Sequence, residues 1–286
     1  MNKLSKIAVY LVGFNLSVQT AIAAPVEGSN MTLTTNGVKK TLVLPEAILY
    51  SNVISLGSHV DPESQMVVDG IMIIHKKQSN AKPGTGGGGN SAVCYSFLAD
   101  GAKWKNVEPW VMNTVNTRGL DGSTVFNLMS GGIAKWEDAA DGKVGNRTSV
   151  DILGVGSATL NPLAADLAMP DGLNEAYFAD ITGLSGNDNT IATTIVWGVF
   201  GGPVEQRQIV ESDIVFDDIS FDWSTTGAAG KMDFENIAMH ELGHALGLGH
   251  ANSGCTEETM YEYAVNGETK KRSLNTGDIK GVNSLY

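Results

Sequence analysis

Eleven residues near the C-terminal end decide what this chain can be: His240-Glu241-Leu242-Gly243-His244-Ala245-Leu246-Gly247-Leu248-Gly249-His250. Histidines four positions apart leave the same face of a helix, one above the other. Because neutral imidazole is a good zinc ligand, His240 and His244 predict two metal ligands on one rigid helix. A His-x-x-x-His with an adjoining Glu arises by chance in roughly one chain in a hundred of this length, but Gly247 and His250 lower that to about one in 10⁵.

Gly247 allows a third histidine to reach the same metal. Glycine lets the chain leave the helix through positive φ at little steric cost, so His250 can return to the ion. Three protein ligands leave the fourth position of a tetrahedral zinc to water, which is typical of a catalytic site. Glu241 is placed to hold that water and take its proton, because zinc lowers the pKa of a bound water to about 7. The alternatives are a structural zinc, three unrelated surface histidines, or a solvated helix carboxylate at Glu241.

The bulk composition describes a globular protein without a basic face. Of 286 residues, 42% are hydrophobic and 17% charged, and the formal net charge is -12. Nucleic acids and anionic membrane surfaces both need a basic patch on their partner, and the longest basic cluster is Lys270-Lys271-Arg272. We therefore expect no nucleic-acid partner. We expect the protein to be a monomer.

The first 23 residues predict a secretory signal peptide. Lys3 and Lys6 give a positive n-region, residues 7–18 an apolar stretch, and Ala21-Ile22-Ala23 a small-x-small cleavage site. The apolar stretch is too short to span a bilayer comfortably, so we expect export to the extracellular space or the periplasm, with no membrane span after cleavage. The chain has two cysteines, and an even count suits an oxidising compartment, so Cys94 and Cys255 are candidates for a disulfide.

A glycine-rich stretch divides the chain. Residues 82–90 have the composition of a flexible linker, and they end a small N-terminal segment, 24–90, that reads as short strands. Hydrophobic patterns over 91–286 predict an α+β domain. Its predicted strands cover 104–113, 149–155, 175–181, 191–200 and 210–216. Its predicted helices are one capped by Ser123, one that Asp233 caps and Gly247 ends, and a last one from about Thr276.

The stretch from His240 to His250 matches the extended zinc motif of the metzincin clan. Other segments resemble one branch of that clan, the matrixin-like peptidases. Thr259-Met260-Tyr261 stands nine to eleven residues past His250, where matrixins have their Met-turn. Residues 274–286 look like the family's closing helix, and residues 213–218 resemble the strand that precedes its active-site helix. The resemblance covers about residues 94–286.

This resemblance implies a metzincin catalytic domain with a twisted, mixed five-stranded sheet, two long helices and a C-terminal helix. It implies one catalytic zinc held by His240, His244 and His250, with Glu241 as general base and Met260 as an apolar floor beneath the metal. It also implies that residues 193–199 form the cleft edge along which an extended peptide pairs by main-chain hydrogen bonds. An ordinary buried strand is the alternative for these residues.

The resemblance leads us to expect a secreted zinc metalloendopeptidase that cleaves protein or peptide substrates, with residues 24–90 as a candidate propeptide. A catalytically silent exported module that keeps zinc to stabilise its fold is the alternative, and a zinc aminopeptidase is a third reading. A zinc-bound thiolate is a further reading of Cys94, although residues 92–96 lack the family's Pro-Arg-Cys-Gly pattern.

Several positions depart from the family. Ala251 stands where matrixins usually carry Ser, and Glu262 and Ala264 stand where they carry the Pro and Tyr that wall the S1′ pocket. His59 and His75 lie outside the domain, and we expect them to be ordinary strand or surface residues rather than ligands of a second zinc. Clustered carboxylates could bind calcium, with a solvated acidic surface as the alternative. The candidates are Asp213, Asp217, Asp218 and Asp222, residues 171–174 and residues 187–189.

Overall fold

The computed structural model describes residues 29–35, 38–44, 52–78, 93–146, 148–182 and 189–286. The predicted signal peptide, the glycine-rich stretch 82–90 and the calcium candidates Asn187 and Asp188 lie outside these residues. Among the described residues, no helix is both long enough and apolar enough to cross a membrane.

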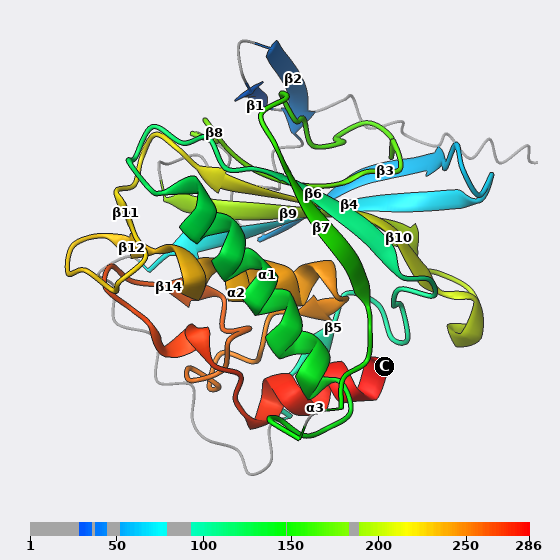
Figure 1. The fold of residues 1–286 in the computed structure, drawn as a ribbon. Coiled ribbons are helices and arrows are strands. Elements are labelled where there is room, and N and C mark those ends of the chain that lie inside the picture. Colours follow the sequence, from blue (N-terminus) through cyan, green and yellow to red (C-terminus); the bar gives the residue numbers. More distant parts are fainter. Residues whose placement is uncertain (1–28, 36–37, 45–51, 79–92, 147, 183–188) are drawn as a thin grey trace, which may run out of the picture.

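One mixed sheet organises the molecule, and five of its strands are those expected from the sequence (Figure 1). These five run in the order β7-β6-β8-β10-β9. The first four are mutually parallel, and β9 is antiparallel to β10. Their bounds are β6 Glu108–Asn113, β7 Leu153–Thr159, β8 Asn174–Ala179, β9 Thr190–Val199 and β10 Gln208–Asp217.

The sheet continues beyond β9, which the sequence did not predict. Strand β4 (Val67–Lys77) pairs with β9 in antiparallel fashion, β3 (Val53–Val60) forms a hairpin with β4, and β14 (Tyr263–Ala264) runs parallel to β4. The N-terminal segment therefore supplies two strands to the sheet that carries the metal motif. Three small pairs complete the strands: β1 (Ser29–Thr35) with β2 (Val38–Leu44), β5 (Ser96–Phe97) with β13 (Leu248–Gly249), and β11 (Trp223–Ser224) with β12 (Met232–Asp233).

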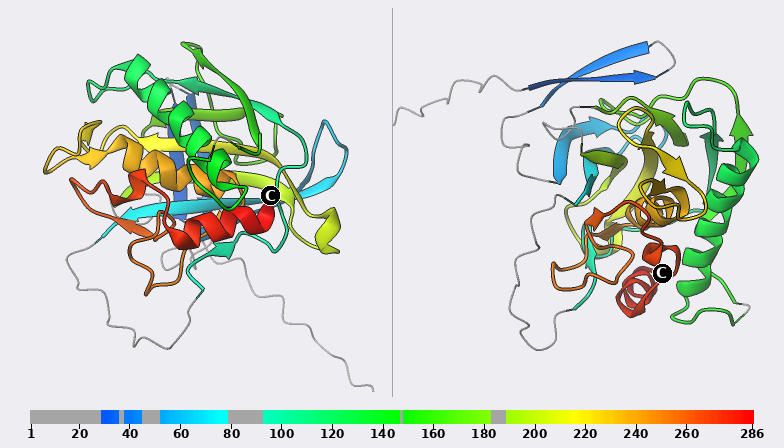
Figure 2. Two further views of the ribbon diagram at one scale, coloured as in Figure 1. Left: turned by 60° about the horizontal axis from the view of Figure 1, so that its bottom comes forward. Right: turned by 90° about the vertical axis from the view of Figure 1, so that its left-hand side faces the viewer.

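Three α-helices lie on one side of this sheet (Figure 2). Helix α1 (Gly122–Ala139) is capped by Asp121 and not by Ser123 as predicted, because the Asp121 carboxylate accepts from the Thr124 amide at 2.8 Å and also from the Ser123 hydroxyl. Helix α2 (Phe234–Ala245) has the predicted Asp233 cap, and the chain leaves it through Gly247 at a φ of 100°. Helix α3 spans Thr276–Leu285, and among the described residues 3₁₀ turns span Val204–Gln206 and Lys270–Arg272.

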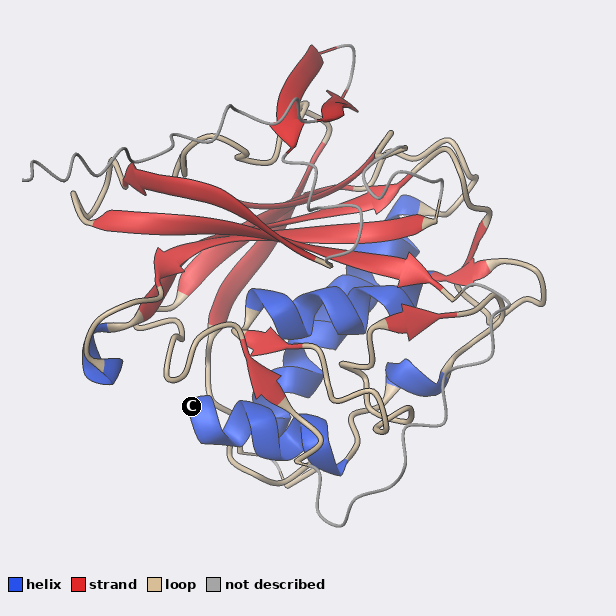
Figure 3. Ribbon diagram, turned by 180° about the vertical axis from the view of Figure 1, so that it is seen from behind, coloured by secondary structure: helices blue, strands red, loops and turns tan. Residues whose placement is uncertain are grey.

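Two hydrophobic cores form on the two faces of the sheet. The core on the helix side contains Trp136 of α1, Leu242 of α2 and Phe216 of β10. The core on the other face of the sheet contains Trp197 and Ile195 of β9. That face of the sheet is nearer the viewer in Figure 3. Strand β4 contributes to both, with Ile73 on the helix side and Val68, Met72 and Ile74 on the other. Because a fully buried side chain of this size contributes about 1.5–3 kcal/mol, these residues stabilise β4 in its position beside β9.

Candidate metal centre

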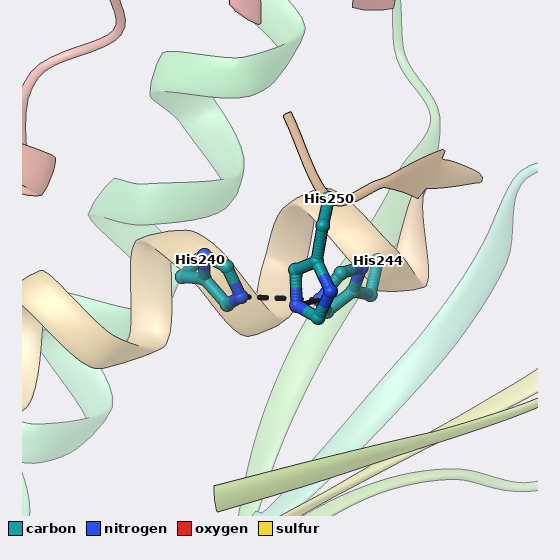
Figure 4. A group of neighbouring side chains, drawn as sticks. All are labelled: His240, His244 and His250. Carbon is teal, nitrogen blue, oxygen red and sulfur yellow. Dashed lines mark hydrogen bonds between the residues drawn. The ribbon is translucent and has the colours of Figure 1, made fainter. Parts of the chain in front are cut away.

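The three motif histidines converge at the end of α2 (Figure 4). The Nε2 atom of His244 lies 3.1 Å from Nε2 of His240 and 3.2 Å from Nε2 of His250. His240 and His244 leave the same face of the helix, and the segment after Gly247 brings His250 back to them (Figure 4). A Cβ at Gly247 would lie 2.7 Å from the carbonyl of Ala102, so this return requires glycine for space as well as for φ.

In His240 and His244, the Nδ1 atom of the imidazole is hydrogen-bonded to a backbone carbonyl. Nδ1 of His240 lies 2.7 Å from the carbonyl oxygen of Thr259, and Nδ1 of His244 lies 2.8 Å from that of Leu248. Because a carbonyl only accepts, each Nδ1 carries the proton and each Nε2 presents its lone pair to the centre of the cluster. Both rings are therefore oriented for a ligand before it binds.

The donor set suits zinc. In a tetrahedral site with nitrogen ligands about 2.0–2.1 Å from the metal, the nitrogens lie roughly 3.3 Å apart, close to the spacing seen here. Burial lowers the pKa of His244 to about 4 and holds the pKa values of His240 and His250 well below their usual range. The imidazoles are therefore neutral, which is the form that binds a metal.

The predicted Met-turn lies directly beneath this cluster. Met260 is buried, and its Sδ packs against Gly243 so closely that a Cβ there would be 2.2 Å away. The turn is held by Asp278 of α3, whose carboxylate accepts from the amides of Thr259 at 2.8 Å and Met260 at 3.1 Å. Since the Thr259 carbonyl orients His240, Asp278 positions a candidate ligand through one intermediate residue.

Glu241 is buried beside the cluster and held from two sides. Its Oε2 accepts from the Thr194 hydroxyl of β9 at 2.6 Å, and its Oε1 lies 2.8 Å from Nδ1 of His75. Burial raises the pKa of Glu241 to about 8, with the Thr194 hydrogen bond opposing the rise. The sequence identified Glu241 but gave no indication of Thr194, because a threonine in an apolar strand has no distinguishing pattern.

His75 is not the ordinary strand residue that we expected. It comes from β4, is fully buried, and stacks on His240 with ring centroids 3.8 Å apart. Burial and the nearby Lys271 hold the pKa of His75 well below its usual range, so its contact with Glu241 is a buried hydrogen bond of a neutral imidazole. His59, in contrast, is exposed on β3 as expected.

Lys271 was also missed, because in the sequence it stands out only as part of the basic cluster Lys270-Lys271-Arg272. The side chain is fully buried, and its Nζ lies 3.2 Å from Nε2 of His75 and donates to the carbonyl of Tyr261. Burial lowers the pKa of Lys271 to about 7. The only sequence signal for His75 and Lys271 is a polar residue within or beside an apolar run, which does not specify a partner.

The strand expected to be an open cleft edge is paired on both sides. The strand β9 bonds to β10 along one edge and to β4 along the other, where Thr194 is opposite Ile73 and Thr193 is opposite Ile74. The described structure therefore corrects the expectation of a free edge at residues 193–199. The other edge of β4 pairs with β3 along most of its length and, at Lys76 and Lys77, with β14, which directly follows the Met-turn.

The residues that depart from the matrixin pattern lie at this junction. Glu262 accepts through Oε2 from the Asn52 side-chain amide at 2.8 Å, and the Ala264 carbonyl accepts from the Gln78 amide at 2.9 Å. Both partners belong to the N-terminal segment. Ala251, the third departing residue, is buried, and its amide donates to the carbonyl of Met260 at 2.8 Å.

Cys94 and Cys255 form a disulfide in the structure, with Cα atoms 5.6 Å apart. A thiolate of Cys94 at the metal is therefore not the arrangement seen. The four aspartates considered for calcium do not meet at one point. Asp217 and Asp218 accept backbone amides, and Asp222 lies 3.8 Å from Arg118. Asp213 instead groups with Asp166 and Glu211, whose carboxylates lie within 4.8 Å of one another.

The C-terminal part of the chain is similar in sequence to known proteins. Residues 185–286 match the sequence model of the matrixin family. Metalloendoproteinase 4-MMP of Arabidopsis thaliana is 41% identical over 68 residues, which are 24% of this chain and 18% of that protein. Matrilysin of Homo sapiens is 39% identical over 62 residues, 22% of each chain. Matrix metalloproteinase-27 of Homo sapiens is 33% identical over 89 residues, 31% of this chain and 16% of that protein.

The match is partial in both directions. The matched stretch spans less than a quarter of the length of each of these relatives. It does include the metal motif and the Met-turn, the segments that carry the convergent histidines. With the mixed α+β sheet and the three α-helices of the described residues, these observations show that the C-terminal part of the chain, residues 185–286, is matrixin-like.

Proposed function

We propose that this protein is an exported zinc-dependent endopeptidase. The observation that carries the proposal is the convergence of three neutral imidazoles beside the carboxylate of Glu241. In this proposal His240, His244 and His250 hold one zinc ion, and Met260 forms the apolar floor beneath it. A zinc ion bound there would supply Lewis acidity, polarising the peptide carbonyl and making water easier to deprotonate.

Glu241 then acts as the general base. The Thr194 hydroxyl fixes Oε2, so Oε1 is the oxygen that can take a proton from water and pass it to the leaving amine. In the structure Oε1 is engaged by His75, and proton transfer requires that this contact opens. The substrate would be a protein or peptide in extended form, and its main chain could pair with β9 only if β4, which occupies that edge, were displaced.

The direct test measures cleavage of casein and of an internally quenched peptide by the zinc-loaded protein, with and without a chelator. We expect cleavage that a chelator abolishes and zinc restores, and loss of at least about a hundredfold in Glu241→Ala. Glu235→Ala is the matched control, because Glu235 lies on the same helix but pairs with Lys135 and Arg272. Cleavage that survives the chelator or the Glu241 variant would contradict the mechanism.

A catalytically silent zinc module is the second candidate. It is favoured by the pairing of β9 on both edges and by the contact of Glu241 with His75. It predicts bound zinc and no cleavage of a peptide library under any condition that opens the site. N-terminally blocked peptides separate the remaining possibility, an aminopeptidase, because only an endopeptidase cuts them.

We further propose export after removal of residues 1–23, a monomeric mature protein, and residues 24–90 as a propeptide. Mass spectrometry of the protein recovered from the culture medium would report its N-terminus, and light scattering its mass. A mature N-terminus upstream of Ala24 would contradict removal of the signal peptide.

Calcium is proposed at the cluster of Asp166, Glu211 and Asp213, not at the aspartates first considered. Glu211 is 1% exposed, and its Oε1 has no hydrogen-bond partner among the described residues. Carboxylate oxygens suit a hard cation, so calcium should raise the melting temperature of the wild type and leave that of Glu211→Gln unchanged. An equal shift in both proteins would contradict this site.

A further inference from the structure

We propose that β4 is an internal occupant of the peptide-binding edge, and that the chain is latent until the β3–β4 hairpin is displaced. The inference rests on the proposed function, since it concerns the same site. It commits to one occupant, residues 67–77 of this chain, held in the position that a substrate would take. Three separate sets of contacts support it.

The main chain of β4 fills the space between two segments that border the metal centre. On one side β4 is antiparallel to β9, with register from Asp69 opposite Gly198 to Lys76 opposite Thr190. On the other side its last residues, Lys76 and Lys77, run parallel to β14. An extended peptide cannot add to β9 while these hydrogen-bonding groups are taken.

The side chain of His75 closes the site itself. It occupies the Oε1 oxygen of Glu241, and its ring covers His240 at a centroid distance of 3.8 Å. Lys271 supports it from behind, with Nζ 3.2 Å from Nε2. A peptide carbonyl entering the site would have to take the volume that this imidazole fills.

Two of the three positions that depart from the matrixin pattern bind the same hairpin. Glu262 accepts from Asn52, which directly precedes β3, and the backbone of Ala264 accepts from Gln78, which directly follows β4. These contacts clamp the hairpin at its two ends. The residues that would shape the S1′ pocket in a matrixin therefore serve the internal strand in this chain.

The test uses full-length, zinc-loaded chains and two probes. The first probe is a fluorescent peptide hydroxamate, which binds a zinc site without being cleaved. The second is a labelled synthetic copy of residues 67–77, which reports on the strand site without needing the metal. We compare the wild type with His75→Ala and with His59→Ala, a matched control because His59 lies in the same hairpin but is exposed.

A second variant keeps the test valid if His75→Ala fails to fold, as judged by circular dichroism. It carries a site for a sequence-specific protease within residues 84–89. Uncut, the hairpin acts at an effective concentration of about millimolar, whereas a cut hairpin can be diluted away. Dilution from micromolar to nanomolar should therefore open the cut chain and leave the uncut chain unchanged.

We expect the hydroxamate to bind His75→Ala and the cut, diluted chain at least tenfold more tightly than wild type and His59→Ala. The labelled strand should bind the cut, diluted chain and not the uncut one. Exclusion of both probes from a cut chain whose hairpin stays bound after dilution would show that β4 is a permanent strand of the sheet, and it would overturn the proposed latency. Equal binding of both probes to all four proteins at every dilution would overturn it.

The same data separate this inference from the proposed function. A cut chain that binds both probes on dilution but cleaves no peptide keeps the occupancy and removes the endopeptidase proposal. The opposite result is an uncut wild type that binds the hydroxamate as tightly as the opened chains and cleaves peptides, with cleavage lost in chelator and in Glu241→Ala. That result would support the endopeptidase proposal and contradict the occupancy.

Discussion

At the residue scale, the close packing of α2 against the Met-turn requires a residue without a Cβ atom at position 243. Gly243 lies between His240 and His244, and a Cβ there would be 2.2 Å from Sδ of Met260 and 2.9 Å from Cζ2 of Trp136. The Met-turn thus reaches the helix because residue 243 has no side chain. Helix α2 and the Met-turn are fitted to each other at this contact.

Gly243→Ala should therefore destabilise the protein by about 1–3 kcal/mol, because Met260 must move from a packed core. It should also weaken zinc binding, since the Thr259 carbonyl that orients His240 moves with the turn. Gly131→Ala is the control, because a Cβ at this helical position meets nothing within 4 Å and should stabilise by about 0.5–1 kcal/mol. Denaturant titrations measure the free energy of unfolding of the two variants. Equal effects of the two substitutions would refute the packing argument.

Thr194 gives a second prediction at this scale. Thr194→Val keeps the shape and removes the donor to Oε2 of Glu241, which leaves a buried oxygen unpaired at a cost of about 1–3 kcal/mol. We expect kcat/KM to fall about tenfold or more with zinc content unchanged. Thr194→Ser should restore most of the activity. A Val variant as active as the wild type would show that the hydroxyl does not position the base.

Sequence reasoning succeeded at this scale where function follows from local spacing. His240, His244 and His250 are close in sequence, and helix geometry together with Gly247 brings them together. His75 lies 166 residues from Glu241 and Lys271 lies 196 residues from His75, so only the folded sheet brings them to the site. Their roles could not be predicted because neither has a periodic or motif signal.

At the element scale, α3 supports the metal centre through its first turn. The Asp278 carboxylate accepts from Thr259, from Met260 and from the N-cap residue Asn275. One buried side chain thus contributes both to the start of α3 and to the Met-turn. The sequence predicted the helix by its hydrophobic pattern and by its resemblance to the family, but it did not show that the helix and the turn share a carboxylate.

Asp278→Asn replaces one accepting oxygen by a donor in this buried position. We expect the free energy of unfolding to fall by about 2–3 kcal/mol, because a buried hydrogen bond to a charged group is lost. We expect zinc affinity to fall roughly tenfold to hundredfold, which is typical when a residue that orients a metal ligand is changed. Calorimetry and a competitive zinc indicator measure the two. Asp151→Asn, at an exposed position, serves as the control. Unaltered zinc affinity in Asp278→Asn would mean that the turn does not depend on α3.

Buried carboxyl groups of β10 make the stability of the protein depend on pH. Burial, with the nearby Asp166 and Asp171, raises the pKa of Glu211 to about 8, and Asp213 beside it has a pKa well above its usual range. A carboxyl whose pKa is raised by folding favours the protonated native state. In the absence of a bound cation, stability is therefore lost as pH rises from the unfolded-state value of about 4.5 to about 8.

Glu211→Gln should remove part of this dependence. Without calcium, we expect the wild type to lose up to about 1.4 kcal/mol per pH unit relative to the variant between about pH 5 and pH 8, with no further divergence above that. Thermal melts at half-unit intervals in chelator measure it. Parallel curves for the two proteins would show that Glu211 ionises as it does in the unfolded chain.

At the scale of the whole molecule, local pattern predicted most of the C-terminal part of the sheet and missed the strands that the N-terminal segment adds to it. Five strands (β6 to β10) and the three α-helices of the described residues in 91–286 were indicated by periodicity and caps, with ends displaced by a few residues. The joining of β4 to β9 was not, because pairing between strands more than a hundred residues apart leaves no trace in either sequence. The same reason hid the occupied cleft edge.

The placement of β4 also determines the order in which the protein can be completed. Strand β4 is made early, yet its partners β9 and β14 follow it by more than a hundred residues. At about 5–20 residues per second on the ribosome, β4 waits roughly 6–25 seconds for β9. During that interval Val67–Ile74, rich in branched apolar residues and without proline, is an unpaired edge that can associate with other chains. Recovery of soluble protein will therefore depend on rapid synthesis or on a chaperone that shields this strand.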